Sequence, residues 1–91
     1  MLTLSLTRAA LKNLRALPAA VIRRLAAGEA PLRVWRAHRG LSLRALAVTA
    51  GISAAMLSEM ETGKKEGSVR TLLALARALG VDMDDLVSWR D

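Results

Sequence analysis

One stretch, residues 41–63 (LSLRALAVTAGISAAMLSEMETG), constrains the fold of this chain more than any other. Ser42 and Ser53 each stand where a side chain caps the start of a short helix, and Gly51 between them permits a sharp turn. Gly63 is placed to end the second helix. Apolar residues recur at helical spacing on both sides of the turn: Leu46, Ala47, Ala50, Ile52, Met56, Leu57 and Met60. The stretch therefore predicts two short helices that cross at a tight turn, a helix-turn-helix.

The remainder of the chain also favours helices, so the predicted fold class is all-α. Five helices are expected from Pro31 onward, and residues 1–30 are expected to form a short N-terminal helical extension to a domain of residues 31–91. Residues 1–6 alternate leucine with threonine or serine, which leaves a short strand and a disordered start equally open. The helices predicted outside the central stretch cover residues 8–15, 18–28, 31–40, 69–79 and 83–89.

Composition excludes several classes of function. The chain has 91 residues, no cysteine and one histidine, so neither a disulfide framework nor a metal site is expected. No nucleophile–base pair or phosphate loop is present, so we expect no enzyme, no cofactor and no small-molecule ligand. No signal peptide and no apolar run of about 20 residues is found, which predicts a cytoplasmic protein without a membrane partner.

The positive charge of the chain is unevenly distributed. The net charge is +6; residues 1–40 contain eight basic residues and one acidic residue, whereas residues 41–91 contain six basic and seven acidic ones. A basic domain indicates an anionic partner, with nucleic acid the leading candidate. On charge alone, a merely solvated surface explains the pattern equally well.

Four short motifs carry a resemblance to a known family. They are R-x-x-R-G-L-S, A-x-x-A-G-I-S, L-S-x-M-E-x-G and A-x-A-L-G-V, all between residues 32 and 87. As a set they resemble the lambda-repressor/Cro-like (XRE-type) helix-turn-helix family. The resemblance implies a five-helix all-α fold and a homodimeric, sequence-specific transcriptional repressor that binds double-stranded operator DNA.

A finer resemblance concerns two other stretches, AGEAPLRVWRAHRG and GKKEGS. They look like antitoxins of the HigA type, which neutralise RelE-like toxins and autoregulate their operon. The alternative is a stand-alone XRE-type regulator without a toxin partner.

The family geometry implies which residues contact DNA. The second helix of the motif lies in the major groove, and its base-facing positions here are Ala54, Ala55, Ser58 and Glu59. Alanine cannot form a hydrogen bond with a base, so direct readout is expected to be weak, and Glu59 either accepts from cytosine N4 or is simply solvated. Contacts to phosphates are implied for Ser42, Arg44, Thr49, Ser53, Thr62, Lys64 and Lys65. The two lysines have a simpler alternative as solubilising residues of a loop.

Other positions are implied to be structural or to bind protein partners. Arg36 and Glu61 match a structural ion pair of the family. Trp35 is either core or interface, and His38 is expected at the surface. The expected dimer surface comprises Met83, Leu86, Val87 and Trp89, and the apolar face available to a toxin comprises Leu11, Leu14, Val21, Ile22 and Leu25.

Overall fold

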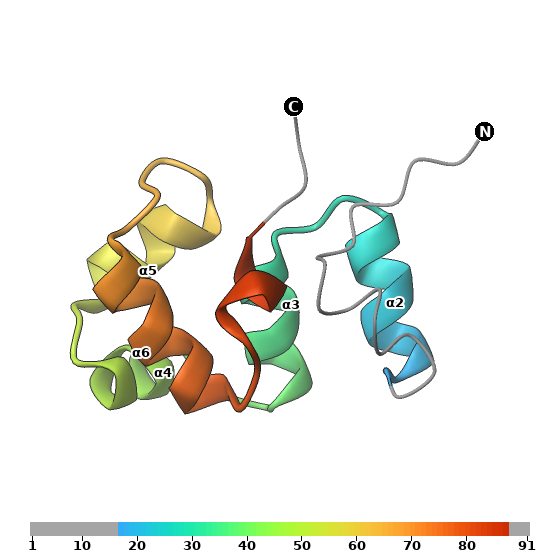
Figure 1. Cartoon of the computed structure of the whole chain (residues 1–91), viewed down its shortest axis with the longest axis horizontal. Helices are drawn as coiled ribbons and strands as arrows, with labels where there is room; N and C mark the ends of the chain where they lie inside the picture. The colour runs from blue at the N-terminus through green and yellow to red at the C-terminus, as the bar shows by residue number, and fades with distance from the viewer. Residues whose placement is uncertain (1–16, 88–91) are drawn as a thin grey trace.

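The computed structural model of the chain describes residues 17–87 (Figure 1). Every regular element in this range is helical, which confirms the predicted all-α class and the five helical elements from Pro31 onward. The strand considered for residues 1–6, the helix over residues 8–15 and Trp89 lie outside the described residues. The elements are α2 (Ala19–Ala26), α3 (Pro31–His38), α4 (Leu43–Ala50), α5 (Ala54–Glu61), α6 (Val69–Leu79) and the 3₁₀ helix η2 (Met83–Leu86).

The helices are arranged around α3 and η2, which lie in the middle of the molecule (Figure 1). On one side α4 packs against both α5 and α6, and on the other side α2 packs against α3. Helices α4 and α5 are bent by 110° relative to each other, within the range of a helix-turn-helix. Among residues 17–87 no single helix is long and apolar enough to cross a membrane; α4 and α5 reach that length only as this bent pair.

The turn between α4 and α5 is built by local interactions that the sequence predicts. The Ser42 hydroxyl oxygen accepts a hydrogen bond from the backbone amide of Ala45 at 3.0 Å, and the Ser53 hydroxyl oxygen accepts one from Met56 at 3.0 Å. Gly51 ends α4 with φ of 74°, a left-handed conformation that a side chain with Cβ disfavours. The predicted caps and turn are therefore confirmed.

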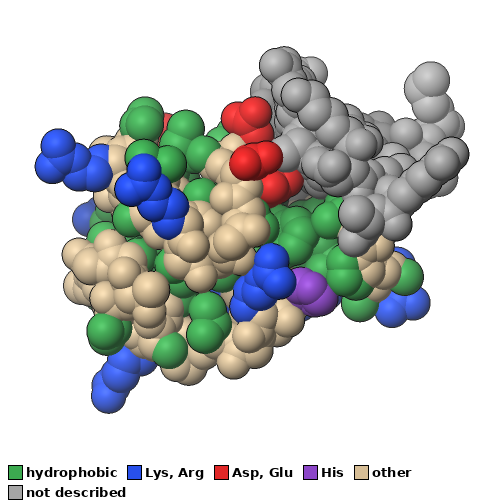
Figure 2. Space-filling view, turned by 60° about the horizontal axis from the view of Figure 1, so that its bottom comes forward, with side chains coloured by type: hydrophobic (Ala, Val, Ile, Leu, Met, Phe, Trp, Pro, Cys, Tyr) green, Lys and Arg blue, Asp and Glu red, His purple; other side chains and the backbone are tan. Residues whose placement is uncertain are grey.

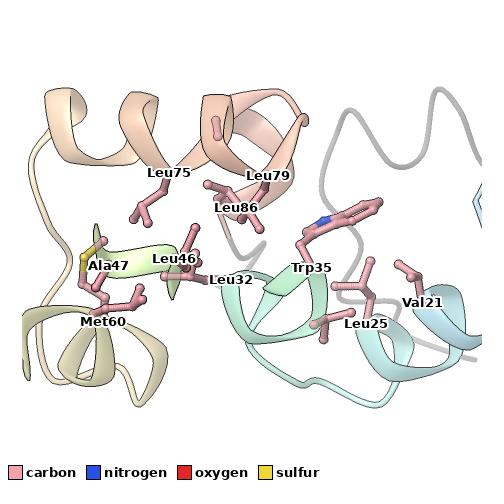
Figure 3. Close-up of a cluster of buried hydrophobic side chains, with 13 residues drawn as sticks. Val21, Leu25, Leu32, Trp35, Leu46, Ala47, Met60, Leu75, Leu79 and Leu86 are labelled. Carbon is pink, nitrogen blue, oxygen red and sulfur yellow. The ribbon is translucent and has the colours of Figure 1, made fainter. Parts of the chain in front are cut away.

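A single hydrophobic core connects all six elements (Figure 3). Leu46, Leu57 and Leu75 from α4, α5 and α6 are fully buried at its centre. Trp35 is 4% exposed and extends the same core toward α2, so of its two predicted positions the structure shows the core. Its ring is also contacted by the Arg39 guanidinium, 5.9 Å from the ring centroid.

Three residues predicted to bind partners are instead buried within the chain's own core. Val21 is 1% exposed and Leu25 is 0% exposed, because α2 has one apolar stripe and that stripe packs against α3. Leu86 is 7% exposed and points into the core from η2. These three residues are therefore not part of an exposed partner surface, which corrects the prediction, whereas Ile22 stays half-buried.

The last helix is shorter than predicted. The sequence predicts a helix over residues 83–89, but η2 is one 3₁₀ turn that ends at Leu86, and Val87 is already extended. The carboxylate of Asp85 accepts a hydrogen bond from the amide of Asp82 at 3.0 Å, which closes this turn onto its own start. The turn leaves Met83 half-buried and the Val87 side chain 48% exposed.

The ion pair implied by the family resemblance joins α3 to the end of α5. Nε and Nη2 of Arg36 donate to the two carboxylate oxygens of Glu61 at 2.6 and 3.1 Å, and Nη1 donates to the backbone oxygen of Leu41 at 2.9 Å. The Glu61 side chain is 6% exposed. The hydrogen bond to Glu61 raises the pKa of Arg36, so the guanidinium keeps its charge at any practical pH.

Removing the carboxylate of this pair is expected to destabilise the fold strongly. In Glu61→Ala the half-buried Arg36 charge loses its counter-charge, and the free energy of unfolding should fall by about 2–4 kcal/mol. Glu29→Ala is the matched control, because Glu29 also pairs with an arginine, Arg24, but on the surface; its effect should be much smaller. Urea unfolding followed by circular dichroism measures both, and equal effects would contradict the prediction.

Candidate nucleic-acid interface

The outward face of α5 is defined by which of its residues pack inward. Leu57 and Met60 are buried, and Ala54, one helical turn before Leu57, is half-buried and packs against the core. Ala54 shares a face with Leu57 and packs partly against the core, whereas Ala55 is exposed. The base-facing role of Ala54, Ala55, Ser58 and Glu59 stays a prediction. The outward face comprises Ala55, Ser58, Glu59 and Thr62.

The four hydroxyl groups predicted to contact phosphates differ in whether their proton is already used in a hydrogen bond within the protein. The hydroxyls of Thr49 and Thr62 donate to backbone oxygens one turn earlier, those of Ala45 and Ser58, each at 3.0 Å. A phosphate oxygen only accepts, so these threonines must first give up an internal bond. Ser42 and Ser53 instead use their oxygens as helix caps, which leaves both hydroxyl protons available.

The starts of α4 and α5 add backbone donors to these hydroxyls. The first amides of a helix have no partner within the helix and carry the positive end of its dipole. Ser42 and Ser53 are both exposed, so each helix start is open to solvent. Arg44 in the first turn of α4 is exposed as well. This arrangement is suited to holding an anionic backbone against α5.

The two lysines after α5 have different surroundings. Lys64 and Lys65 are both exposed, but Nζ of Lys65 lies 3.7 Å from a carboxylate oxygen of Glu59. The sequence reasoning missed this pair, although Gly63 between the two residues is the signal of a chain reversal that brings them together. Lys65 is therefore not a free phosphate-binding cation in this structure.

Acidic and basic side chains are distributed differently on the face drawn in Figure 2. The acidic side chains gather mostly in one patch near the middle, whereas basic side chains project from several places, including the end formed by α4, α5 and α6. His38 is exposed, as predicted, and contacts the edge of Trp35 with ring centroids 5.9 Å apart. Among residues 17–87, no three His, Cys, Asp or Glu side chains gather into a group that could hold a metal ion.

Comparisons with known proteins agree with this geometry. The family model described as a helix-turn-helix domain matches residues 30–89. The HTH-type transcriptional regulator DdrOP3 of Deinococcus deserti is 41% identical over 56 residues, which cover 62% of this chain and 43% of that protein.

Two solved structures are similar in fold. The clp gene regulator ClgR of Corynebacterium glutamicum is 42% identical with a TM-score of 0.60, over 63% of this chain and 61% of that one. SinR of Bacillus subtilis, the master regulator for biofilm formation, solved in complex with DNA, is 28% identical with a TM-score of 0.59, over 63% of this chain and 95% of that one. The chain thus spans less than two thirds of DdrOP3 and of ClgR. It belongs to the helix-turn-helix domain family, of the XRE type with a lambda-repressor-like fold.

Proposed function

We propose that the chain is a sequence-specific DNA-binding transcriptional repressor that lays α5 in the major groove of its operator. The observation that carries this proposal is the outward face of α5 lying beside two open helix starts, those at Ser42 and Ser53. The helix starts and Arg44 are suited to phosphates, which position a protein on DNA, and the α5 face is suited to base edges. The similarity to SinR, solved with DNA, supports the same role.

The repressor is proposed to act as a homodimer. A single small module whose reading face is short binds weakly, and two half-sites multiply its affinity. Of the predicted dimer residues within the described range, Val87 is exposed and Met83 is half-buried, whereas Leu86 is buried in the core. The dimer surface is therefore proposed around Val87, together with Trp89, which lies beyond the described residues.

Salt dependence tests the phosphate contacts. Binding of a basic protein to DNA weakens with salt, and each phosphate contact adds about 0.9 to the slope of log K for DNA binding against log[salt]. If Lys64 contacts a phosphate, Lys64→Ala should reduce that slope by about 0.9, because fewer counterions are released. Arg23→Ala is the control, since Arg23 is exposed on α2 at the far end of the molecule from α5, and its slope should equal that of the unchanged protein. Mobility-shift titrations at four salt concentrations measure this. An unchanged slope in Lys64→Ala would place this lysine away from the DNA backbone.

The oligomeric state tests the dimer surface. Val87→Asp should convert the dimer into a monomer, because a buried carboxylate without a partner opposes association. Val48→Asp is the matched control: Val48 is 73% exposed on α4, away from η2, and the dimer should persist. Sedimentation equilibrium distinguishes the two variants, and a dimer that survives Val87→Asp contradicts this surface.

An antitoxin role is the second candidate. It is supported by the resemblance of residues 27–40 and 63–68 to HigA-type antitoxins, and it needs an apolar surface for a RelE-like toxin. Val21 and Leu25 are buried against α3, so the surface left on α2 is reduced to the half-buried Ile22. We therefore favour the stand-alone XRE-type regulator.

Purification from the native host distinguishes these two candidates. A stand-alone regulator should elute as a dimer without a stoichiometric protein partner, whereas an antitoxin should carry a small basic protein with it. Mass spectrometry of the eluted complex identifies such a partner. A stoichiometric partner that degrades RNA once released would reverse our preference and establish the antitoxin role.

A further inference from the structure

The outward face of α5 offers DNA one long polar side chain. Within the described residues of α5, the long polar side chains are those of Glu59 and Glu61. Glu61 is held by Arg36 and is 6% exposed, so it does not reach outward. Ala55 has no hydrogen-bonding group, and Ser58 and Thr62 are short. The carboxylate of Glu59 is therefore the group on this face that extends furthest toward a base.

Lys65 contacts Glu59 through both its backbone and its side chain. Gly63, with φ of 81°, reverses the chain after α5. The amides of Lys64 and Lys65 then donate to the backbone oxygen of Glu59 at 2.8 and 3.2 Å, and Nζ of Lys65 lies 3.7 Å from the Glu59 carboxylate. The position of Lys65 beside Glu59 is thus fixed by the helix end.

The Lys65 ammonium reduces the electrostatic repulsion that the Glu59 carboxylate would meet in DNA. A carboxylate in the major groove lies between two rows of phosphates and is repelled by them. The Lys65 ammonium offsets this repulsion. Its side chain is flexible, so the ammonium can contact the Glu59 carboxylate and a phosphate at the same time. Because both side chains of the pair are exposed, the pair is weak in water and rearranges at little cost.

We propose that Glu59 reads cytosine through its N4 amino group and that Lys65 is the positioning residue that keeps this carboxylate in the groove. The proposal rests on the proposed DNA-binding function. A carboxylate only accepts hydrogen bonds, and in the major groove the bases that donate are cytosine, through N4, and adenine, through N6. Adenine presents the acceptor N7 beside its amino group, and that acceptor repels a carboxylate. Guanine and thymine present acceptors, so cytosine is favoured.

The first experiment identifies the base. The full chain selects sites from a randomised double-stranded DNA pool, and affinities are then measured for the selected site and its three single-base substitutions at one position. The unchanged protein should prefer cytosine there by about tenfold or more. Glu59→Gln should lose that preference and favour adenine instead, because an amide pairs with both N6 and N7. A cytosine preference that persists in Glu59→Gln overturns the reading role of Glu59.

The second experiment isolates Lys65. Lys65→Ala should reduce the cytosine preference itself, in addition to weakening binding. Lys64→Ala is the matched control, because Lys64 is the adjacent lysine with the same charge and exposure, and it should weaken binding to all four sites by the same factor. If Lys65→Ala also weakens all four sites equally, Lys65 is a plain phosphate contact and the positioning role is wrong.

The outcomes separate this proposal from the proposed function. If the unchanged chain selects no DNA even at low salt, DNA binding itself is refuted. If it selects a site in which no position depends on Glu59, DNA binding stands and the base assignment fails. Thermal melts by circular dichroism verify that each variant is folded, as expected for substitutions of exposed side chains.

Discussion

The guanidinium of Arg36 is the contact on which the geometry of the domain depends. It spans three segments: α3, from which it projects, the Leu41 carbonyl just before α4, and Glu61 at the end of α5. Helix α5 is therefore held at its C-terminal end by the Arg36 guanidinium, while its N-terminal end is set by the Gly51 turn. Because two ends of an eight-residue helix are fixed, the orientation of its outward face follows from contacts that never touch DNA.

The structure divides α5 into two sides with separate tasks. Leu57 and Met60 belong to the buried core through which α5 packs against α4 and α3, whereas Ala55, Ser58 and Glu59 lie outside that core. The link between the two sides is the helix end, where Lys64 and Lys65 fold back onto the Glu59 carbonyl. The hydrogen bonds that cap the end of α5 thus also place the Lys65 ammonium beside the Glu59 carboxylate.

Local features were predictable from the residues themselves, whereas the one tertiary contact predicted and found, the Arg36–Glu61 ion pair, was implied by the family resemblance. The caps at Ser42 and Ser53 and the turn at Gly51 depend on a few neighbouring residues, so their residue types reveal them. Spacing also identifies the apolar side of α2, but it cannot say whether that side meets the chain itself or a partner, and Val21 was misassigned for this reason. Ala54 and Ala55 are the same residue type, and the packed structure shows that Ala54 is half-buried whereas Ala55 is exposed.

The sparse outer surface of α5 has an evolutionary consequence. Its side chains are small or solvent-exposed, so replacing one of them changes the stability of the domain little. If this face reads bases as proposed, single substitutions on it can change the preferred operator without compensating changes elsewhere in the domain. The residues that hold the fold and the residues proposed to recognise bases are different ones, so the two properties can vary independently.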